Sequence, residues 1–472
     1  MSETKILQTN GEFIPLDENT ITELRASLRG ELLAQEDKGY DEARTIWNAM
    51  IDRKPALIIR CAGTSDVQAA VRFAGTHNLH FSVKGGGHNI AGNAVCNDGL
   101  MIDLSEMKSV RIDPLEKRAH VEPGATLSDL DHESQSFGLA TPVGINSTTG
   151  VAGLTLGGGF GWISRKHGLT LDCLVEADVV TADGKFLKAN ANDNKDLFWA
   201  IRGGGGNFGI VTRFVYKLFN VGPEVLSGLI IFPLADAKNA LTKFREYCKT
   251  LSDDTCVWVV MRQAPPLPFL PEEVHGTDVI VFALCHIGDA DAGKKAIEPI
   301  RSFGTMVGEH VGQMPFAGWQ QAFDPLLTPG ARNYWKSHNF LELEDGLIDT
   351  AIEYTKTLPS PQCEIFFALL GGEINRVASD ATAYPHRDAN FVMNVHGRWD
   401  DASDDDKCIK WSREYFDATA PFATGGVYIN FMTEDEADRV GSGFGSSMDK
   451  LKDMKRKYDP KNMFRMNQNI KP

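Results

Sequence analysis

The sequence predicts an α+β protein with at least two domains. Its 472 residues exceed the roughly 250–300 at which a single hydrophobic core stops growing. The first 220 residues mix short strands with helices and carry three glycine clusters, whereas the chain from about 225 has longer apolar strands with amphipathic helices between them. We therefore expect a Gly-rich α+β domain followed by a domain built on an antiparallel sheet that helices cover on one face.

The N-terminal elements lead into a β-α-β unit. Residues 20–50 have a helical pattern that ends near Trp47, so residues 1–50 are predicted to be an N-terminal helical segment. The segments "PALIIRC" (55–61), "DVQAAVRFAGTHN" and "LHFSV" (79–83) follow, and their apolar spacing changes from 2 to 3.6 and back. The helix of this unit is expected to begin at Thr64-Ser65-Asp66.

Two hairpins are expected in the remainder of the first domain, which we place at residues 51–224. "LMIDLSEMKSVRIDPLEKRAHVEPGA" contains strands around an Asp113-Pro114 turn, and "LVEADVVTADGKFLKAN" contains the turn signal Asp183-Gly184. The second domain, residues 225–424, contains the strands "CVWVVMRQ", "DVIVFALCHIG", "EIFFALLGG" and "FVMNVHGRW", with helices such as 236–250 between them. Residues 425–472 end in "MKRKYDPKNMFRMNQNIKP" (454–472), an Asn- and Pro-rich stretch that we expect to be extended chain.

The composition excludes several classes of partner. A formal net charge of −15 without a Lys/Arg cluster would repel a phosphate backbone and an anionic membrane surface, so no nucleic-acid partner and no membrane partner are expected. The N-terminus lacks the basic and apolar regions of a secretory signal, which leads us to expect a cytoplasmic protein. Eight cysteines without CxxC spacing are expected to be buried thiols rather than zinc ligands or disulfides.

Three glycine clusters carry the functional signal: "KGGGHN" (84–89), "GVAGLTLGGGFGW" (150–162) and "RGGGGNFG" (202–209). Glycine is used where the backbone takes a positive φ or approaches a ligand closely, although each cluster alone could be a tight turn or bulge. The third cluster satisfies G-x-G-x-x-G, but a helical pattern precedes it and a strand follows, which is the reverse of a Rossmann site. The clusters are consistent instead with loops whose N–H groups hold a pyrophosphate.

Together these motifs resemble the FAD-dependent oxidoreductases of the vanillyl-alcohol oxidase superfamily, in the branch of berberine bridge enzyme, hydroxynicotine oxidase and the oligosaccharide oxidases. The resemblance covers most of the chain and rests on "SVKGGGHNIAG", "GLMIDLSEM", "TPVGINSTTGVAGLTLGGGFGWISRKHGLTLD", "DLFWAIRGGGGNFGIVT" and "YINF…KRKYDPKNMFRMNQNI". It implies a two-subdomain PCMH-type FAD-binding domain at 51–224, a substrate-binding domain at 225–424, and a berberine-bridge-like segment at 425–472 that returns to the FAD domain.

The resemblance also implies that His88 is bonded through a ring nitrogen to the methyl group on the benzenoid ring of the flavin. Such a link withdraws electrons and should raise the reduction potential of the flavin. From its residue type alone, His88 could equally be a histidine that hydrogen-bonds within a glycine turn. Members with a second link carry a cysteine where this sequence has Asn146, and asparagine has no thiolate. We therefore expect covalent FAD through His88 alone, with no cysteinyl link.

The remaining FAD contacts implied by the resemblance lie in the glycine clusters and near the C-terminus. They are Lys84, Gly85, Gly86, Gly87, Asn89, Asn146, Ser147, Gly150, Val151, Ala152, Gly153, Ile210, Asn430 and Asn467.

Two residues are candidates for the proton acceptor. A period of 2 in "GVYINFM" would place Tyr428 beside Asn430, and the family often uses a tyrosine here as a base, which requires its pKa of about 10 to be lowered. His396 is the second candidate, because the same period in "FVMNVHGRW" aligns it with Asn394 and Arg398. Tyr428 could instead be a packed tyrosine, and the polar side of the second strand could be a solvated face.

The expected activity is that of an FAD-dependent oxidase or dehydrogenase acting on a CH–OH or CH–NH group of a small organic substrate. Oxygen or another compound would accept the electrons. The alternative is a degenerate covalent flavoprotein that serves as a binding or structural module. No metal is expected, because the histidines show no H-x-x-x-H or H-E-x-x-H pair. A sugar, an alkaloid-like amine and a phenolic alcohol all remain candidate substrates, and the sequence makes no prediction of oligomeric state.

Overall fold

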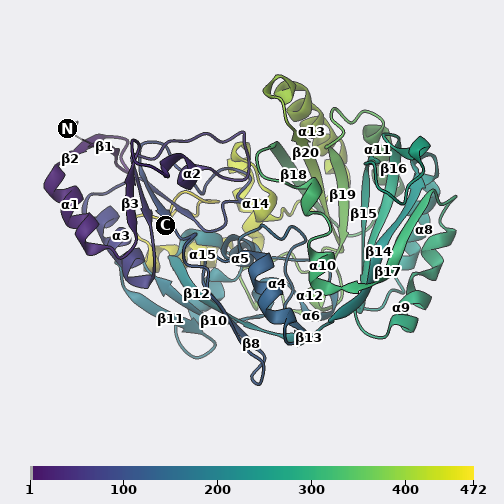
Figure 1. Ribbon diagram of the computed structural model, residues 1–472, viewed down its shortest axis with the longest axis horizontal. Coiled ribbons are helices and arrows are strands. Elements are labelled where there is room, and N and C mark those ends of the chain that lie inside the picture. The colour runs from purple at the N-terminus through teal and green to yellow at the C-terminus, as the bar shows by residue number, and fades with distance from the viewer. Residues whose placement is uncertain (1–3) are drawn as a thin grey trace.

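The computed structural model describes residues 4–472. The chain forms an elongated molecule with the N-terminal half at one end and a seven-stranded sheet at the other (Figure 1). The first described residues and the C-terminus lie at the same end of the molecule, opposite the seven-stranded sheet, because the last residues return to the first half of the chain. No helix among residues 4–472 is long and apolar enough to cross a membrane.

Two sheets organise the N-terminal half. The four-stranded sheet has the order β3-β4-β6-β5, in which β4, β6 and β5 are parallel and β3 is antiparallel to β4. Its strands are β3 (Glu31–Ala34), β4 (Leu57–Arg60), β5 (Phe81–Lys84) and β6 (Leu100–Asp103). The five-stranded antiparallel sheet has the order β11-β10-β12-β8-β7. Its strands are β7 (Val110–Asp113), β8 (Arg118–Val121), β10 (Leu174–Val180), β11 (Phe186–Asn190) and β12 (Ile210–Lys217).

The predicted β-α-β unit and both predicted hairpins of this half are confirmed. Helix α3 (Thr64–Thr76) connects β4 to β5, and both strands pair in parallel with β6 between them. The strands β7 and β8 pair across the first predicted turn, and β10 and β11 pair across the second. The glycines of the third cluster follow helix α7 (Lys195–Ile201) and precede β12, so this region has no Rossmann topology.

The remaining elements of this half are short. They are β1 (Thr4–Leu7), β2 (Phe13–Leu16), α1 (Glu18–Ser27), α2 (Tyr40–Arg44), α4 (Leu127–Gln135), β9 (Leu139–Ala140), α5 (Val151–Gly157), α6 (Ser164–His167) and β13 (Phe219–Asn220).

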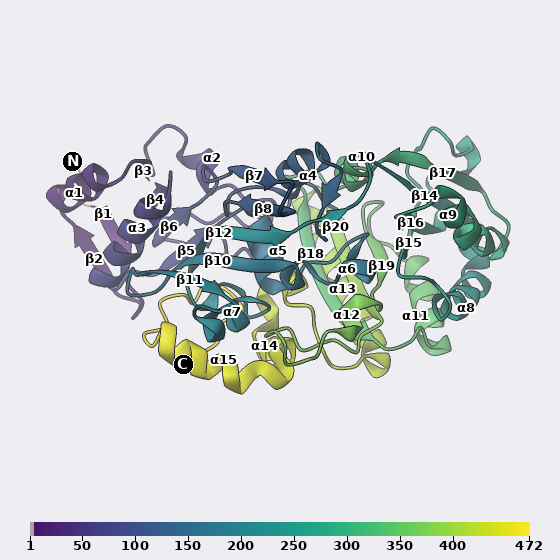
Figure 2. The same ribbon diagram turned by 90° about the horizontal axis from the view of Figure 1, so that it is seen from below.

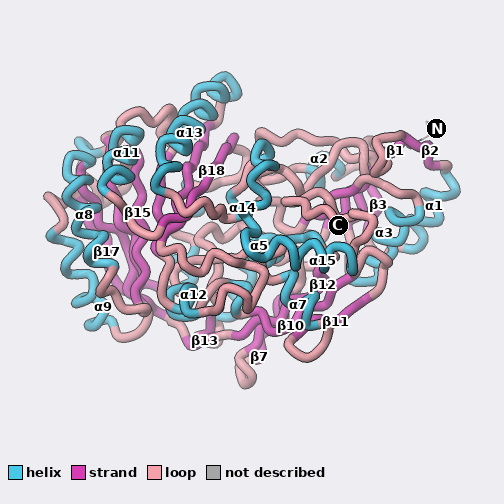
Figure 3. Tube along the Cα trace, turned by 180° about the vertical axis from the view of Figure 1, so that it is seen from behind, coloured by secondary structure: helices cyan, strands magenta, loops and turns pink. Residues whose placement is uncertain are grey.

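The second half contains an antiparallel sheet with the order β17-β14-β16-β15-β19-β20-β18, as the sequence predicts. Its strands are β14 (Glu224–Pro233), β15 (Thr255–Gln263), β16 (Asp278–His286), β17 (Gly308–Pro315), β18 (Arg332–Phe340), β19 (Glu364–Leu369) and β20 (Phe391–Trp399). Helices α8 (Ala237–Cys248), α9 (Ala290–Ile297), α11 (Asp345–Thr355) and α13 (Asp405–Thr419) cover its outer face (Figure 3). The short helices α10 (Phe316–Gln320) and α12 (Glu373–Arg376) lie in its connections.

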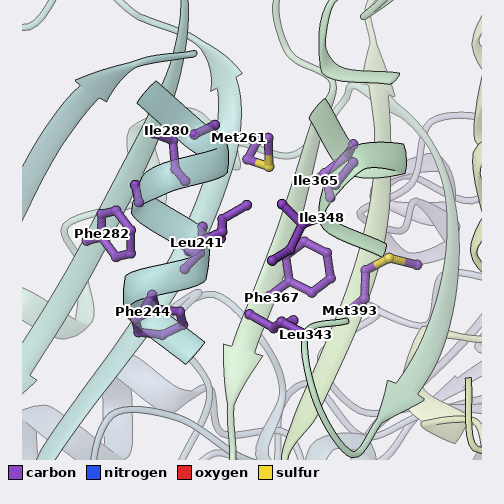
Figure 4. Close-up of a cluster of buried hydrophobic side chains, with 14 of the residues drawn as sticks. Leu241, Phe244, Met261, Ile280, Phe282, Leu343, Ile348, Ile365, Phe367 and Met393 are labelled. Carbon is purple, nitrogen blue, oxygen red and sulfur yellow. The ribbon is translucent and has the colours of Figure 1, made fainter. Parts of the chain in front are cut away.

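The outer face of this sheet packs into the main core of the second half. Leu241 and Phe244 of α8 and Ile348 of α11 contact side chains from the strands, including Phe282 and Phe367 (Figure 4). Alternation along each strand therefore points every second side chain to the helices. The intervening side chains face the N-terminal half, where they line the cavity described below.

The C-terminal segment lies against the first half. Helices α14 (Val440–Phe444) and α15 (Met448–Tyr458) run along one side of the molecule, and α15 lies beside α7 (Figure 2). The tail continues to Ile470, whose N–H donates to Asn207 in the third glycine cluster at 3.0 Å.

Three expectations about elements were wrong. Residues 20–50 are not one helical region, because β3 separates α1 from α2; Leu32 and Leu33 are both buried, on opposite faces of β3, which favours a strand paired with β4. Residues 429–431 form a 3₁₀ turn rather than a strand. The stretch 454–458 is the end of α15, so the extended tail begins only at Asp459. The expectation of buried thiols is confirmed for seven of the eight cysteines, whereas Cys248 is only partly buried.

Candidate active site

The three glycine clusters line one cavity between the two halves of the molecule. The first two approach each other through their backbones: a Cβ on Gly86 would lie 2.5 Å from the nitrogen of Gly150, and a Cβ on Gly150 would lie 2.5 Å from the nitrogen of Gly86. Gly87 has a φ of +70°, which side chains disfavour. Glycine is therefore required here by close backbone contact and by conformation.

His88 follows these glycines and lines the cavity. Its Nε2 lies 2.9 Å from Oγ1 of Thr148, its Nδ1 lies 3.4 Å from Oγ1 of Thr149, and its ring stacks on Trp47 with centroids 5.0 Å apart. Loss of solvation lowers the pKa of His88 to about 3. The imidazole is therefore neutral at physiological pH, and one of its ring nitrogens keeps a lone pair.

Most residues that the sequence associates with FAD line this cavity. They are Gly85, Gly86, Gly87, His88, Asn89, Asn146, Gly150, Ala152, Gly153, Ile210, Asn430 and Asn467.

Three others lie away from the cavity wall. Lys84 donates to the carbonyl of Ala43 at 2.7 Å. The N–H and hydroxyl of Ser147 both bind the carboxylate of Asp324, which lies in the connection between β17 and β18. Val151 packs into the core of the five-stranded sheet. Proximity to a motif along the chain does not fix the direction of a side chain, and each of these three points to the protein interior or to the second half.

The two asparagines near the C-terminus place their side chains at the cavity. Nδ2 of Asn430 donates to the carbonyl of Leu154 at 3.1 Å and to the hydroxyl of Tyr428 at 3.0 Å. Nδ2 of Asn467 donates to the carbonyls of Gly206 and Phe464, while its buried Oδ1 has no protein partner. The amide donors are thus used within the protein, and the side-chain oxygens are the atoms left to accept a hydrogen bond.

Tyr428 lies in the same cavity as Asn430, although a 3₁₀ turn rather than a strand brings them together. Its hydroxyl oxygen accepts hydrogen bonds from the N–H of Gly159 at 2.8 Å and from Asn430. Burial raises the pKa of Tyr428 to about 12, despite the opposing effect of these two donors. This shift is opposite in direction to the lowered pKa that a tyrosine base needs.

His396 lies on the opposite wall of the cavity, in β20. It belongs to a row across three adjacent strands, in which Arg262 of β15 pairs with Glu364 of β19, and Glu364 pairs with His396. We call Arg262, Glu364 and His396 the charged row. Nδ1 of His396 lies 3.1 Å from Oε1 of Glu364, and Arg262 lies 2.7 Å from Oε2. The polar side of β20 is buried, so it is not the solvated face that the pattern also allowed.

Within the charged row, one hydrogen-bond acceptor, Nε2 of His396, has no partner. Burial raises the pKa of Glu364, but Arg262 and His396 outweigh this effect and lower it to about 2. Burial lowers the pKa of His396 from its usual value, while Glu364 acts in the opposite direction. A carboxylate only accepts, so Nδ1 of the neutral imidazole donates to Glu364 and Nε2 carries the lone pair. This Nε2 is buried and has no hydrogen-bond partner in the protein.

Sequence reasoning missed Arg262, Glu364 and the aromatic residues around them. Trp335 of β18 lies directly opposite His396, with ring centroids 4.6 Å apart, and Trp47 contacts both Trp335 and His88. The alternation in "CVWVVMRQ" could have placed Arg262 on the cavity side of its strand. Nothing in the sequence pairs it with Glu364, which lies 102 positions further along the chain.

The residues of this cavity fit FAD. Loops without side chains allow the backbone close to a large ligand, a neutral histidine stands at the cavity wall, and Oδ1 of Asn467 is a buried acceptor without a partner. Within residues 4–472, no group of three or more His, Cys, Asp or Glu side chains is arranged to hold a metal ion.

Comparisons with known proteins agree with this assignment of the cofactor. Residues 55–190 match the FAD binding domain family, and residues 427–471 match the family described as berberine and berberine like. An FAD-linked oxidoreductase of Dictyostelium discoideum is 32% identical over 455 residues, which is 96% of this chain and 97% of that protein. The chitooligosaccharide oxidase of Gibberella zeae is 29% identical over 93% of this chain and 92% of its own.

The fold has a counterpart among solved structures. The crystal structure of 6-hydroxy-D-nicotine oxidase from Arthrobacter nicotinovorans superposes with a TM-score of 0.85 at 27% identity, covering 94% of this chain and 98% of that chain.

Proposed function

Because the chain belongs to the berberine bridge enzyme-like FAD-linked oxidoreductases, we propose that it removes a hydride from an alcohol or amine carbon of a small organic substrate. Relatives named as oxidases of a hydroxynicotine and of chitooligosaccharides support both kinds of carbon. The observation that carries the proposal is the position of His396, whose unpartnered Nε2 lines the same cavity as His88 and the glycine loops.

We also propose that FAD is held covalently through His88 alone. Bound FAD supplies the acceptor for the hydride. A neutral imidazole with a lone pair on one ring nitrogen supports this bond, and Thr148 and Trp47 hold the ring in place. Asn146 also lines the cavity, but its amide has no nucleophilic atom comparable to a thiolate, and its Oδ1 accepts from the hydroxyl of Thr148 at 2.8 Å.

The proton of the substrate heteroatom must leave as the hydride leaves carbon. The contacts support His396 as its acceptor rather than Tyr428. Nε2 of His396 has a lone pair, and Glu364 stabilises the imidazolium that forms. The hydroxyl oxygen of Tyr428 already accepts two hydrogen bonds, so this residue is better suited to fix Asn430 and the loop at Gly159.

Anaerobic mixing tests the activity. We expect the flavin absorbance near about 450 nm to bleach with some member of a panel of sugars, amines and alcohols. If no compound bleaches the flavin while dithionite does, the protein is a binding or structural module instead.

Acid precipitation tests the link. Wild-type protein should keep its yellow colour after denaturation and should fluoresce on a denaturing gel, because the flavin is bonded to His88. The variant His88→Ala should lose this colour, whereas His132→Ala, at an exposed position of α4, should keep it. Release of all FAD from denatured wild-type protein would refute covalent attachment.

A further inference from the structure

The cavity side of the seven-stranded sheet is divided into a charged part and an apolar part. On β15, β16 and β14, the three strands next to β19 on one side, two rows of aligned residues are apolar. One row is Leu229, Ala283 and Trp258, and the other is Ile231, Val281 and Val260. Val279 lies next to Arg262 at the end of the charged row. We call the aliphatic residues of this region the apolar lobe; they are Leu229, Ile231, Val260, Val279, Val281 and Ala283, and all line the cavity.

The connection between β15 and β16 closes the apolar lobe. Its Ala264 and Leu270 pack with Ile231, Val279 and Val281 into a separate hydrophobic cluster. The base of the connection is fixed by two backbone hydrogen bonds of 2.9 Å that join residue 264 to residues 276 and 277. Four prolines, at 265, 266, 268 and 271, restrict its backbone. The lobe is therefore a shaped compartment rather than an open surface.

The apolar lobe is separate from the residues assigned to FAD. Those residues belong to the N-terminal half and the C-terminal segment, whereas the lobe is built from β14, β15 and β16. Two strand spacings separate β15 from β14, which gives the lobe a width of about 10 Å beyond Val260. Diphosphate and ribityl groups would lose their hydrogen bonds in such a compartment, so these parts of FAD do not occupy it.

From this arrangement, and resting on the proposed function, we propose that the substrate is an apolar alcohol or amine whose hydrocarbon or aryl-alkyl tail occupies the apolar lobe. Its single polar group lies at the charged row, where Nε2 of His396 has no partner. None of the six lobe side chains can pair with a hydroxyl, and Trp258 in the first row offers only one donor, its unpartnered Nε1. A sugar ring placed there would therefore bury several unsatisfied hydroxyls. Oligosaccharides are therefore poor substrates for this chain.

A series of phenyl-substituted primary alcohols, from phenylmethanol to 6-phenylhexanol, tests the proposal with the flavin-loaded enzyme. The dissociation constant is measured from the shift of the flavin absorption spectrum under anaerobic conditions, alongside the rate of flavin reduction. We expect the dissociation constant to fall about threefold to fourfold for each methylene that enters the lobe. Chito- and xylo-oligosaccharides should bind at least tenfold more weakly than the longest alcohol.

Two variants locate the binding site. Leu229→Gln places an amide in the lobe and should remove the dependence on tail length, whereas the same change at Leu115, which is 92% exposed on the β7–β8 turn, should leave it intact. Val260→Phe should fill the lobe and weaken the binding of long tails more than that of phenylmethanol. Covalent flavin content and melting temperature check that each variant is folded.

The outcomes separate this proposal from the proposed function. Binding that strengthens with tail length but never reduces the flavin would support the apolar lobe and refute the oxidation of these alcohols. Flavin reduction without any dependence on tail length, or with oligosaccharides bound more tightly, would support the activity and refute the lobe. An unchanged length dependence in Leu229→Gln would also refute it.

Discussion

At the scale of single residues, burial changes the pKa values of the two side chains that are candidates for the proton acceptor. Tyr428 and His396 both lie in one cavity, but burial shifts their pKa values in opposite directions, because it disfavours the charged form of each. The phenol of Tyr428 becomes harder to ionise, whereas the imidazole of His396 stays neutral to lower pH. The same physical effect thus supports the proposal that His396 rather than Tyr428 accepts the proton.

The pH dependence of flavin reduction should therefore report His396. We expect the rate to rise with pH through a pKa below 6.5 and to be constant at higher pH, because only the neutral imidazole accepts a proton. Glu364→Gln removes a charge that raises the pKa of His396, so the rise should move to lower pH. Stopped-flow reduction at saturating substrate from pH 5 to 10 measures both effects.

A comparison of two variants completes this test. His396→Ala should slow reduction by roughly 10²–10⁴-fold without loss of covalent flavin. A base with the pKa of Tyr428 would instead give a rate that increases about tenfold per pH unit up to about pH 12. That profile, together with an equally large loss in Tyr428→Phe, would return the role to Tyr428.

The contact between Gly86 and Gly150 is also decided at the scale of single atoms. In Gly86→Ala, the added methyl group would lie 2.4 Å from Cα of Gly150, and both loops must move apart. We expect this variant to lose most of its bound FAD, measured as the ratio of flavin to protein absorbance. Gly441→Ala in α14, where the new Cβ meets nothing within 4 Å, should keep full flavin content.

At the scale of elements, one buried ion pair fixes the C-terminal helix to its tail. Both Lys455 of α15 and Asp459 are fully buried, and their charged atoms lie 2.7 Å apart. The ammonium also donates to the carbonyls of Asn207 and Phe464, and Asp459 accepts from the N–H groups of Met463 and Phe464. The turn from helix to extended chain therefore depends on a completely satisfied polar cluster.

Removing one partner of this ion pair should lower the free energy of unfolding. Lys455→Met leaves the carboxylate of Asp459 buried without its counter-charge, and we expect the free energy of unfolding to fall by about 3–5 kcal/mol. Lys452→Met in the same helix, where the pair with Asp449 is exposed, should change it by no more than about 1 kcal/mol. Urea denaturation followed by tryptophan fluorescence measures both; equal midpoints would contradict the proposed anchoring role.

At the scale of the whole molecule, polar contacts join the two halves around the cavity. The side chain of Asn48 donates to the carbonyls of Ile90 and Asn333 and accepts from the N–H of Asn333. On another side, Asp131 of α4 accepts from Gln320 of α10 at 3.1 Å. Burial raises the pKa of Asp131 to about 7, although this hydrogen bond opposes the shift. The carboxyl therefore loses its proton near neutral pH, at the boundary between the halves.

The raised pKa of Asp131 predicts the sign of a pH effect. The contribution of the Asp131 carboxyl to folding stability is fully present below its ordinary pKa of 3.8 and is lost as the pH rises to about 7. Asp131→Asn stays neutral, and its amide can donate to Oε1 of Gln320, which is buried without a partner. The variant should therefore unfold at a higher temperature than wild type at pH 8, with a difference that shrinks towards pH 4.

The change Asp438→Asn is the control, because Asp438 is exposed. It should give the same small difference from wild type at every pH. If Asp131→Asn is less stable than wild type at pH 8, then the carboxylate of Asp131 is stabilising and the expected sign is wrong.

The sequence by itself determined the fold class and the glycine loops with His88, and its resemblance to a known family pointed to FAD contacts of which most line the cavity. The fold class and the loops follow from short-range patterns, because apolar period selects strand or helix and glycine marks backbone that cannot carry a side chain. The individual FAD contacts are what the resemblance implies. The apolar pattern failed at residues 20–50, where β3 pairs with β4, and at residues 429–431, which form a 3₁₀ turn instead of a strand.

Only the tertiary structure decided the chemistry of the opposite wall. Arg262, Glu364 and His396 meet because β15, β19 and β20 are neighbours in one register, and neither strand order nor register is encoded within a single segment. The same register separates the charged row from the apolar lobe. The pKa shifts of His396 and Tyr428 arise from desolvation, which depends on every segment packed around them and therefore exists only in the folded chain.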